Sequence, residues 1–222
     1  ARNVLLILLT SDKGLCGSFN SSLAREAERF IQDQPGRNVY LFTLGKYGAR
    51  YFKRRGYPLE DERPAYDFSV HYYHLMGLFR EIEDAFLTGR FSEIWLLYSR
   101  FINPVRQVPT LLKLLPVEHE GLVAGLTEEE REPKKIEDFI FSPGRQEVLD
   151  SMLPRFVRYS VFNAVRENYT SENAARMMAM DNATKNAGEM IDNLTLAYNK
   201  ARQQAITMEL LDIVGGSEAL QA

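Results

Sequence analysis

The chain has 222 residues, of which 45% are hydrophobic, and this is enough to bury the core of one or two domains. Its formal net charge of −3 speaks against a general binder of nucleic acid or of anionic membranes. A single cysteine, Cys16, excludes an intrachain disulfide framework.

The first predicted element is a buried strand over residues 4–9, a continuous apolar run that ends in a loop over residues 11–20. The run is far shorter than the ~20 residues that span a membrane, and no positively charged segment precedes it. We therefore expect neither a membrane span nor a signal peptide. Because the strand begins so close to the start of the sequence, we also expect a further segment upstream of it.

Helical and strand patterns alternate over the next hundred residues. Helical spacing of apolar residues predicts helices over 21–32, 46–55 and 71–87, and apolar runs predict buried strands over 38–45 and 93–102. This order of elements predicts an open α/β sheet with crossover helices.

The sheet is expected to end in edge strands and one late strand. Residues 105–117 contain three prolines, and proline is confined to edges or strand ends because it cannot donate to a sheet ladder. A charged stretch over residues 127–135 predicts an excursion into solvent, and residues 136–141 predict the last strand.

A very long helix is predicted after this strand. Ser142 is a typical N-cap and Pro143 fits the first helical position, where its missing N–H costs nothing. Up to Val214 only Pro154 and Gly188 interrupt helical sequence, and we expect Pro154 to mark a kink or the start of the straight part. The predicted division is an α/β domain over 1–141 and a long helix over 142–222.

An apolar stripe of small and flexible residues runs along this helix at alternating spacings of three and four. Its members are Met180, Ala183, Ala187, Met190, Leu194, Ala197, Ala201, Gln204, Met208 and Leu211. This spacing predicts a coiled-coil seam. A helix this long and this sparsely apolar does not persist alone in water, and nothing else in the sequence is long enough to pair with it. The partner must be another chain or a segment outside this sequence.

The loop over residues 11–20 is the first candidate for chemistry. A glycine loop at the end of a strand is where doubly wound folds bind nucleotides, but Gly14 and Gly17 match neither common phosphate-binding fingerprint. A nucleophilic Cys16 needs a base and an orienting group, and no histidine is placed for that role. We favour a packed cysteine in a tight turn.

Other candidates also have ordinary explanations. His71 and His74 have metal-ligand spacing on one helix, but without a third ligand we expect them to face solvent. The methionines of residues 177–180 fit ordinary helix packing. Residues 202–214 mix polar and apolar side chains on one slender helix, which predicts a helix end surrounded by other protein.

Two stretches carry a resemblance to a known family. The loop "SDKGLCGSFN" and residues 167–216, "ENYTSENAARMMAMDNATKNAGEMIDNLTLAYNKARQQAITMELLDIVGG", closely resemble the γ subunit of F-type ATP synthase, and the resemblance covers essentially the whole chain. It implies a central rotor shaft, in which an N-terminal helix and the long C-terminal helix form an antiparallel coiled coil above a Rossmann-like α/β foot. The family's N-terminal helix is not in this sequence, and it is the partner that the seam requires.

The resemblance also implies partners and a location. It implies a ring of three α and three β subunits, the ε subunit and the c-ring, no nucleic acid, and contact with the membrane only through the Fo sector. The expected location is the cytoplasmic face of the bacterial membrane, with the matrix face of the mitochondrial inner membrane as the alternative. It implies no catalytic residue, cofactor or metal in this chain, and no thiol regulation, because the paired cysteines of chloroplast members are absent.

Finally, the resemblance implies interface residues. The loop residues Asp12, Lys13 and Cys16 resemble those that face the acidic lever loop of β. The helix residues that resemble contacts with the α3β3 ring are Arg202, Gln203, Thr207, Glu209, Leu210, Ile213 and Val214. Phe139, Phe141 and Ser142 resemble the foot near ε and the c-ring, although relatives have tyrosine and an acidic residue at the last two positions. The alternatives are a small doubly wound nucleotide-binding enzyme with a helical oligomerisation tail, and a generic coiled-coil scaffold.

Overall fold

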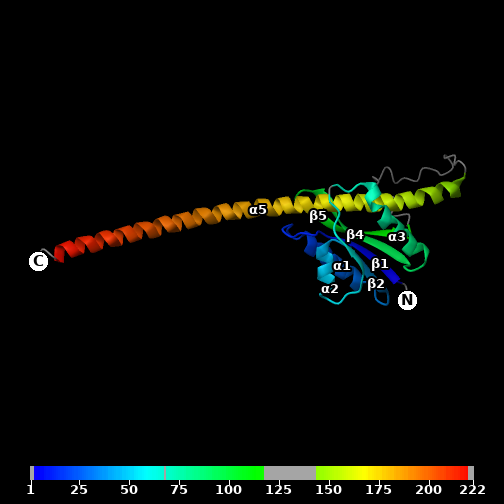
Figure 1. Cartoon of the computed structure of the whole chain (residues 1–222), viewed down its shortest axis with the longest axis horizontal. Helices are drawn as coiled ribbons and strands as arrows, with labels where there is room; N and C mark the ends of the chain where they lie inside the picture. Colours follow the sequence, from blue (N-terminus) through cyan, green and yellow to red (C-terminus); the bar gives the residue numbers. More distant parts are fainter. Residues whose placement is uncertain (1–2, 68, 118–143, 220–222) are drawn as a thin grey trace. The chain divides into compact units, whose positions relative to one another are not determined.

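The computed structural model describes residues 3–67, 69–117 and 144–219, and it divides into two compact units, residues 1–178 and residues 179–222. The first unit is built on a five-stranded sheet with the strand order β3-β2-β1-β4-β5 (Figure 1). The strands are β1 (Asn3–Leu9), β2 (Asn38–Leu44), β3 (Leu59–Arg63), β4 (Glu93–Asn103) and β5 (Arg106–Leu115). The first four are parallel and β5 is antiparallel to β4.

Helices cover both faces of the sheet, as the predicted α/β class requires. Helices α1 (Phe19–Gln32) and α2 (Lys46–Lys53) pack on one face, with Leu23 and Phe52 fully buried. Helix α3 (Met76–Leu87), which follows a short 3-10 turn η1 (Tyr72–Leu75), covers the other face together with the first part of α5 (Arg145–Ala219). Because β1 lies in the middle, its side chains alternate between two apolar cores.

The predicted strands over 4–9, 38–45 and 93–102 are confirmed as β1, β2 and β4. The edge prediction for residues 105–117 is confirmed as the single strand β5. Sequence reasoning missed β3, whose sequence is Leu-Glu-Asp-Glu-Arg. This strand occupies the opposite edge of the sheet, where it needs only main-chain pairing with β2 and its charged side chains remain accessible to water.

Helix α5 is assigned without interruption over 75 residues, through both Pro154 and Gly188. Residues 179–219 of the helix form the described part of the second unit, about 60 Å long at 1.5 Å per residue. The strand predicted over 136–141, the helix start at Ser142 and the foot residues Phe139 and Phe141 lie outside the described residues.

In the part of the chain that the structure describes, no helix combines the length and the apolar character that crossing a membrane requires.

Candidate functional site

The loop after β1 is held together by one buried side chain. The Asn20 carboxamide accepts a hydrogen bond from the Ser11 backbone N–H at 3.0 Å and donates to the Ser11 hydroxyl at 2.6 Å. The Ser11 hydroxyl donates in turn to the carbonyl of Lys13 at 2.6 Å. Asn20 and Ser11 are both buried, so α1 fixes the loop through a closed hydrogen-bond network.

The same part of the fold leaves no open cradle for a phosphate. The first three N–H groups of α2 donate to the Asp12 carboxylate, the Ser11 carbonyl and the Thr10 hydroxyl, at 2.9, 3.1 and 3.0 Å. A helix start binds phosphate through such N–H groups when they are free. Gly45 precedes α2 with a φ of 114°, and a Cβ there would overlap the carbonyl of Thr10. The N–H groups that a phosphate would need are therefore already used within the chain.

Cys16 is a core residue, as the prediction of a packed cysteine requires, although the resemblance placed it among the residues that face β. Its side chain is 2% exposed and belongs to the apolar cluster that includes Phe19 and Leu23. The Asn20 amide lies 3.3 Å from the sulfur. No histidine among the described residues contacts this thiol, and the prediction of a packed cysteine in a tight turn is confirmed.

The surface of this loop presents a different residue. Leu15 is 75% exposed and has a φ of 63°, an unusual conformation for a large side chain. Lys13 is exposed beside it. The Asp12 carboxylate is already hydrogen-bonded within the chain, because it accepts from the N–H groups of Lys46 and Ala65. Sequence reasoning did not single out Leu15, because only the backbone shows that it points away from the core.

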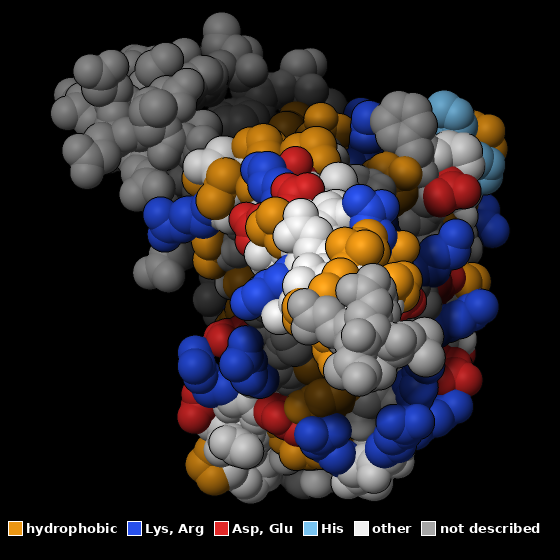
Figure 2. Space-filling model, turned by 90° about the vertical axis from the view of Figure 1, so that its left-hand side faces the viewer, with side chains coloured by type: hydrophobic (Ala, Val, Ile, Leu, Met, Phe, Trp, Pro, Cys, Tyr) orange, Lys and Arg blue, Asp and Glu red, His pale blue; other side chains and the backbone are white. Residues whose placement is uncertain are grey.

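A basic surface lies on α2 next to this loop. A hollow of about 470 Å³ between α2 and β3 is lined by Lys46, Ala49, Arg50, Lys53, Arg54, Glu62, Arg63 and Pro64. Glu62 pairs with Lys53 at 2.7 Å, whereas Lys46 and Arg50 form no ion pair within the described residues. Figure 2 shows Lys and Arg side chains over most of the face drawn there, with several of them low on it beside Asp and Glu.

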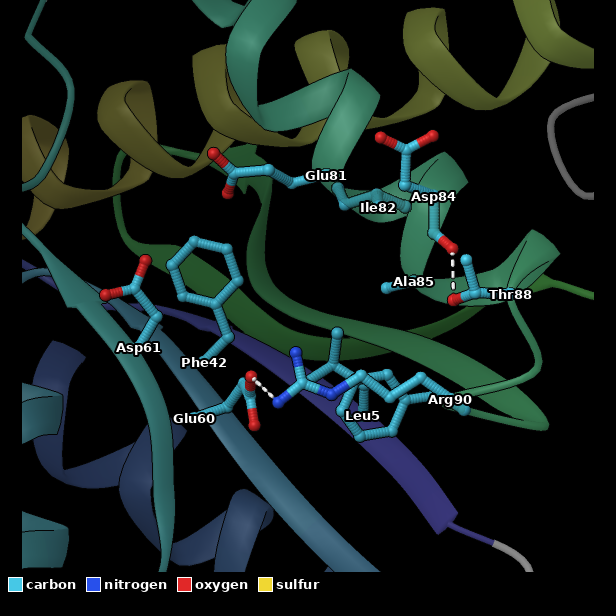
Figure 3. A pocket seen from close by; sticks show the side chains of 11 residues that line it. Leu5, Phe42, Glu60, Asp61, Glu81, Ile82, Asp84, Ala85, Thr88 and Arg90 are labelled. Carbon is cyan, nitrogen blue, oxygen red and sulfur yellow. Dashed lines mark hydrogen bonds and ion pairs between the residues drawn. The ribbon is translucent and has the colours of Figure 1, made fainter.

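A second pocket, of about 430 Å³, lies between α3 and the β3 edge (Figure 3). Its apolar floor includes Leu5 and Phe42. Its acidic side chains are Glu60, Asp61, Glu81 and Asp84; Glu60 is paired with Arg90, and Asp61 and Glu81 are both paired with Arg63. The arginines are thus held by carboxylates, and β1 and β4 begin near the pocket, whereas doubly wound folds bind nucleotides at the carboxyl ends of their strands.

The two histidines face solvent, as expected. His71 and His74 flank the exposed tyrosines of η1, and the His74 Nδ1 accepts a hydrogen bond from the His71 N–H at 3.0 Å. Among the described residues no group of three potential ligands surrounds a metal site. The nitrogen of His74 thus helps to form the turn that begins α3.

The second unit exposes its apolar side chains almost throughout. Its most exposed large apolar residues are Met190, Ile191, Leu194, Leu196, Tyr198, Met208, Leu211 and Ile213, each with more than 60% of its surface accessible. Ala183, Ala187, Ala197 and Ala201 are exposed as well. The seam residues therefore lie on a helix, as predicted, and they pack against nothing within the described chain.

The predicted ring contacts lie near the end of this helix. Arg202, Gln203, Thr207 and Glu209 are exposed, and so are Leu210, Ile213 and Val214. Their apolar members occupy several sides of the helix, since residues 206, 210 and 213 fall on the side away from the seam and residue 214 lies on its flank. A helix that is apolar on more than one side is stable only when other protein surrounds it.

The fold combines a class of domain, an open α/β sheet covered by helices, with a long helix that packs on nothing within the described residues. The family model for ATP synthase matches residues 1–220. The chain is 40% identical to the ATP synthase gamma chain of Syntrophus aciditrophicus over 222 residues, which cover 99% of this chain and 74% of the relative. It is also 40% identical to that of Desulforudis audaxviator, again over 99% of this chain and 75% of the relative. The chain belongs to the family of ATP synthase gamma chains.

Solved structures agree on the fold. The chain resembles one in a mitochondrial ATP synthase structure from Euglena gracilis, described as OSCP/F1/c-ring, with a TM-score of 0.70 and 21% identity over 99% of this chain and 73% of that chain. A second likeness is to the central stalk and c-ring structure of the Tetrahymena thermophila enzyme, with a TM-score of 0.58 and 24% identity over 82% of this chain and 76% of that chain. The fold of this chain is therefore shared with chains of these two ATP synthase structures.

Proposed function

We propose that this chain is the central rotor shaft of an F1Fo ATP synthase and transmits torque between the c-ring and the catalytic α3β3 ring. The observation that carries the proposal is the second unit, a helix about 60 Å long whose apolar side chains are exposed on several sides. Such a helix is stable only inside an assembly. Because the chain belongs to the family of ATP synthase gamma chains, we take ATP synthase to be that assembly.

In this proposal a second helix packs against the seam. Alanine at four of its positions leaves space for close approach of a partner backbone. The resemblance of the sequence to γ subunits assigns this place to the N-terminal helix of the same subunit. The two helices form the antiparallel coiled coil, and the polar and apolar residues of 202–214 contact the bore of the ring.

In the proposed mechanism, the three β subunits make different contacts with the shaft at any one moment. The shaft is asymmetric, so each of the three β subunits meets a different side of it at any moment. Because γ contacts differ between the states of a β site, rotation shifts each site through its states in turn. Many weak polar contacts, such as those of Gln203 and Thr207, suit a shaft that must slide within its bearing.

The loop after β1 has a separate role in the proposal. Lys13 and the basic surface of α2 carry the charge that complements the acidic lever loop of a β subunit, and the exposed Leu15 adds an apolar contact. Exposed charge pairs of this kind contribute only ~0.2–1 kcal/mol each. They steer the encounter and leave the loop free to move past successive β subunits.

The chain is a subunit of a rotary enzyme, and we assign ATP chemistry to α and β alone. The foot contacts the ε subunit and the c-ring, and the chain reaches the membrane only through that ring. Its bacterial relatives support a peripheral position on the cytoplasmic face of the cell membrane.

Native mass spectrometry tests the assignment. The chain, extended by the N-terminal helix of a bacterial relative, is mixed with α and β subunits and is expected to give a complex with one copy of γ per α3β3. A matched control ends at Met178 and lacks the second unit; it is expected to stay outside the ring. Failure of the extended chain to join α3β3 would overturn the proposal, and equal binding of the control would show that the helix is not the contact.

A further inference from the structure

We propose that hydrogen bonds between α5 and β4 form the torsional joint by which load passes between the α/β domain and the shaft helix. The inference rests on the proposed rotor function. Its key residues are Asn168 and Ser171 of α5, which bind the main chain of Ser99 on β4. All three side chains lie within the first unit and are at least 95% buried.

The joint exists because β1 is shorter than β4. The ladder between them ends at the pair Leu8 and Leu97, so the β1-facing edge of β4 continues beyond its strand partner. Residues 99 and 101 both point their main-chain groups to this edge, because strand residues repeat with period two.

Helix α5 supplies the missing partners. The Ser99 N–H donates to the Asn168 side-chain oxygen at 3.0 Å, and the Ser171 hydroxyl donates to the Ser99 carbonyl at 2.8 Å. The Phe101 N–H donates to the Glu167 carboxylate at 3.1 Å. Burial raises the pKa of the neighbouring Tyr98, and the charge of Glu167 raises it further. Three successive main-chain groups of β4 are thus satisfied by one turn of a helix.

These bonds constrain rotation more sharply than the apolar contacts do. The fully buried side chains of α5 in this core are short, namely Val157, Val161, Ala164 and Val165, and Phe162 packs against their edge. Apolar burial is non-directional and changes gradually as a helix turns, whereas a hydrogen bond depends steeply on distance and angle. A rotation or shift of α5 at Ser99, in contrast, breaks these hydrogen bonds and leaves buried polar groups without partners.

A second anchor prevents pivoting about the first. The Arg158 guanidinium donates two hydrogen bonds to the Glu83 carboxylate of α3, at 2.6 and 2.7 Å. Arg158 precedes Ser171 by 13 helical positions, which is roughly 20 Å along the axis. Two directional attachments at this separation hold the helix against both twist and tilt.

The test measures torsional stiffness in the assembled complex. A rod is attached to the chain through the substitution Arg25→Cys at an exposed position of α1. The α3β3 ring is fixed to a surface and stalled with a non-hydrolysable ATP analogue. The variant Asn168→Leu with Ser171→Ala is expected to raise the mean-square angular fluctuation of the rod about twofold, because directional links are removed while apolar packing is kept. ATP hydrolysis without load is expected to stay unchanged.

Matched controls come from the same helix. Asn173 and Ser160 donate to carbonyls four residues earlier within α5, so Asn173→Leu with Ser160→Ala changes the same residue types without touching β4. This control is expected to leave the fluctuation as in the unmodified complex. If the double variant does not fold, Ser171→Ala alone is measured, and a smaller increase above its Ser160→Ala control is expected.

Two outcomes overturn the inference. One is a folded joint variant with unchanged fluctuation, and the other is an equal increase in the control. Both leave the rotor assignment intact if the unmodified complex rotates under ATP. Failure of the unmodified complex to rotate would instead contradict the proposed function itself.

Discussion

Replacing Asn20 by leucine tests how the loop after β1 is held. Leucine keeps the branched shape and the number of heavy atoms but cannot accept from the Ser11 N–H or donate to its hydroxyl, at 3.0 and 2.6 Å in the native chain. Leaving one buried donor unsatisfied costs about 1–3 kcal/mol, and with the second lost bond the expected destabilisation is about 2–4 kcal/mol. For a unit of this size the melting temperature should fall by about 4–16 °C.

The single tryptophan makes the measurement specific to this unit. Trp95 of β4 packs on Phe30 of α1 with ring centroids 5.3 Å apart, so its fluorescence reports separation of α1 from the sheet. Urea titration should move the midpoint of unfolding without changing the slope. Asn38→Leu is the control, because Asn38 is exposed and its side chain makes one hydrogen bond of 3.3 Å. Equal stability of the two variants would refute the reasoning.

Three further predictions concern Gly45, Cys16 and the exposed end of α5. Gly45→Ala should destabilise the chain by about 3 kcal/mol or more, because a Cβ at this position overlaps the main chain just after β1. Gly36→Ala is the control, since its Cβ meets no atom within 4 Å and the substitution should cost less. Urea unfolding measures the stability of both variants. Cys16→Ala should cost about 1 kcal/mol and leave ATP turnover of the assembled complex unchanged, and loss of turnover would favour a catalytic thiol. Gln203→Leu with Thr207→Val should lower coupled ATP turnover while the circular dichroism of the chain stays constant, because both side chains are exposed; unfolding would mean that they are core residues.

The sequence predicted the elements that have strong local patterns. Buried strands such as β1 are continuous apolar runs, and the face of α3 that carries Leu78 and Ile82 repeats at helical spacing. The sequence analysis did not predict strand β3, because an edge strand with charged side chains has no such apolar pattern. Burial of Cys16 was also predicted, since a small apolar residue between two glycines fits a tight turn.

The α/β domain, the long helix and a seam that needs a partner can all be predicted from the sequence, because they depend on the periodicity of apolar residues along a local segment. The pairing of polar groups is visible only in the folded chain. Asn20 closes the loop after β1, and Asn168 and Ser171 bind β4, through pairings that span 9, 69 and 72 residues of sequence. Hydrogen bonds between distant segments leave no periodic trace, since their partners are chosen by the ends of strands and by the packing of helices on the sheet.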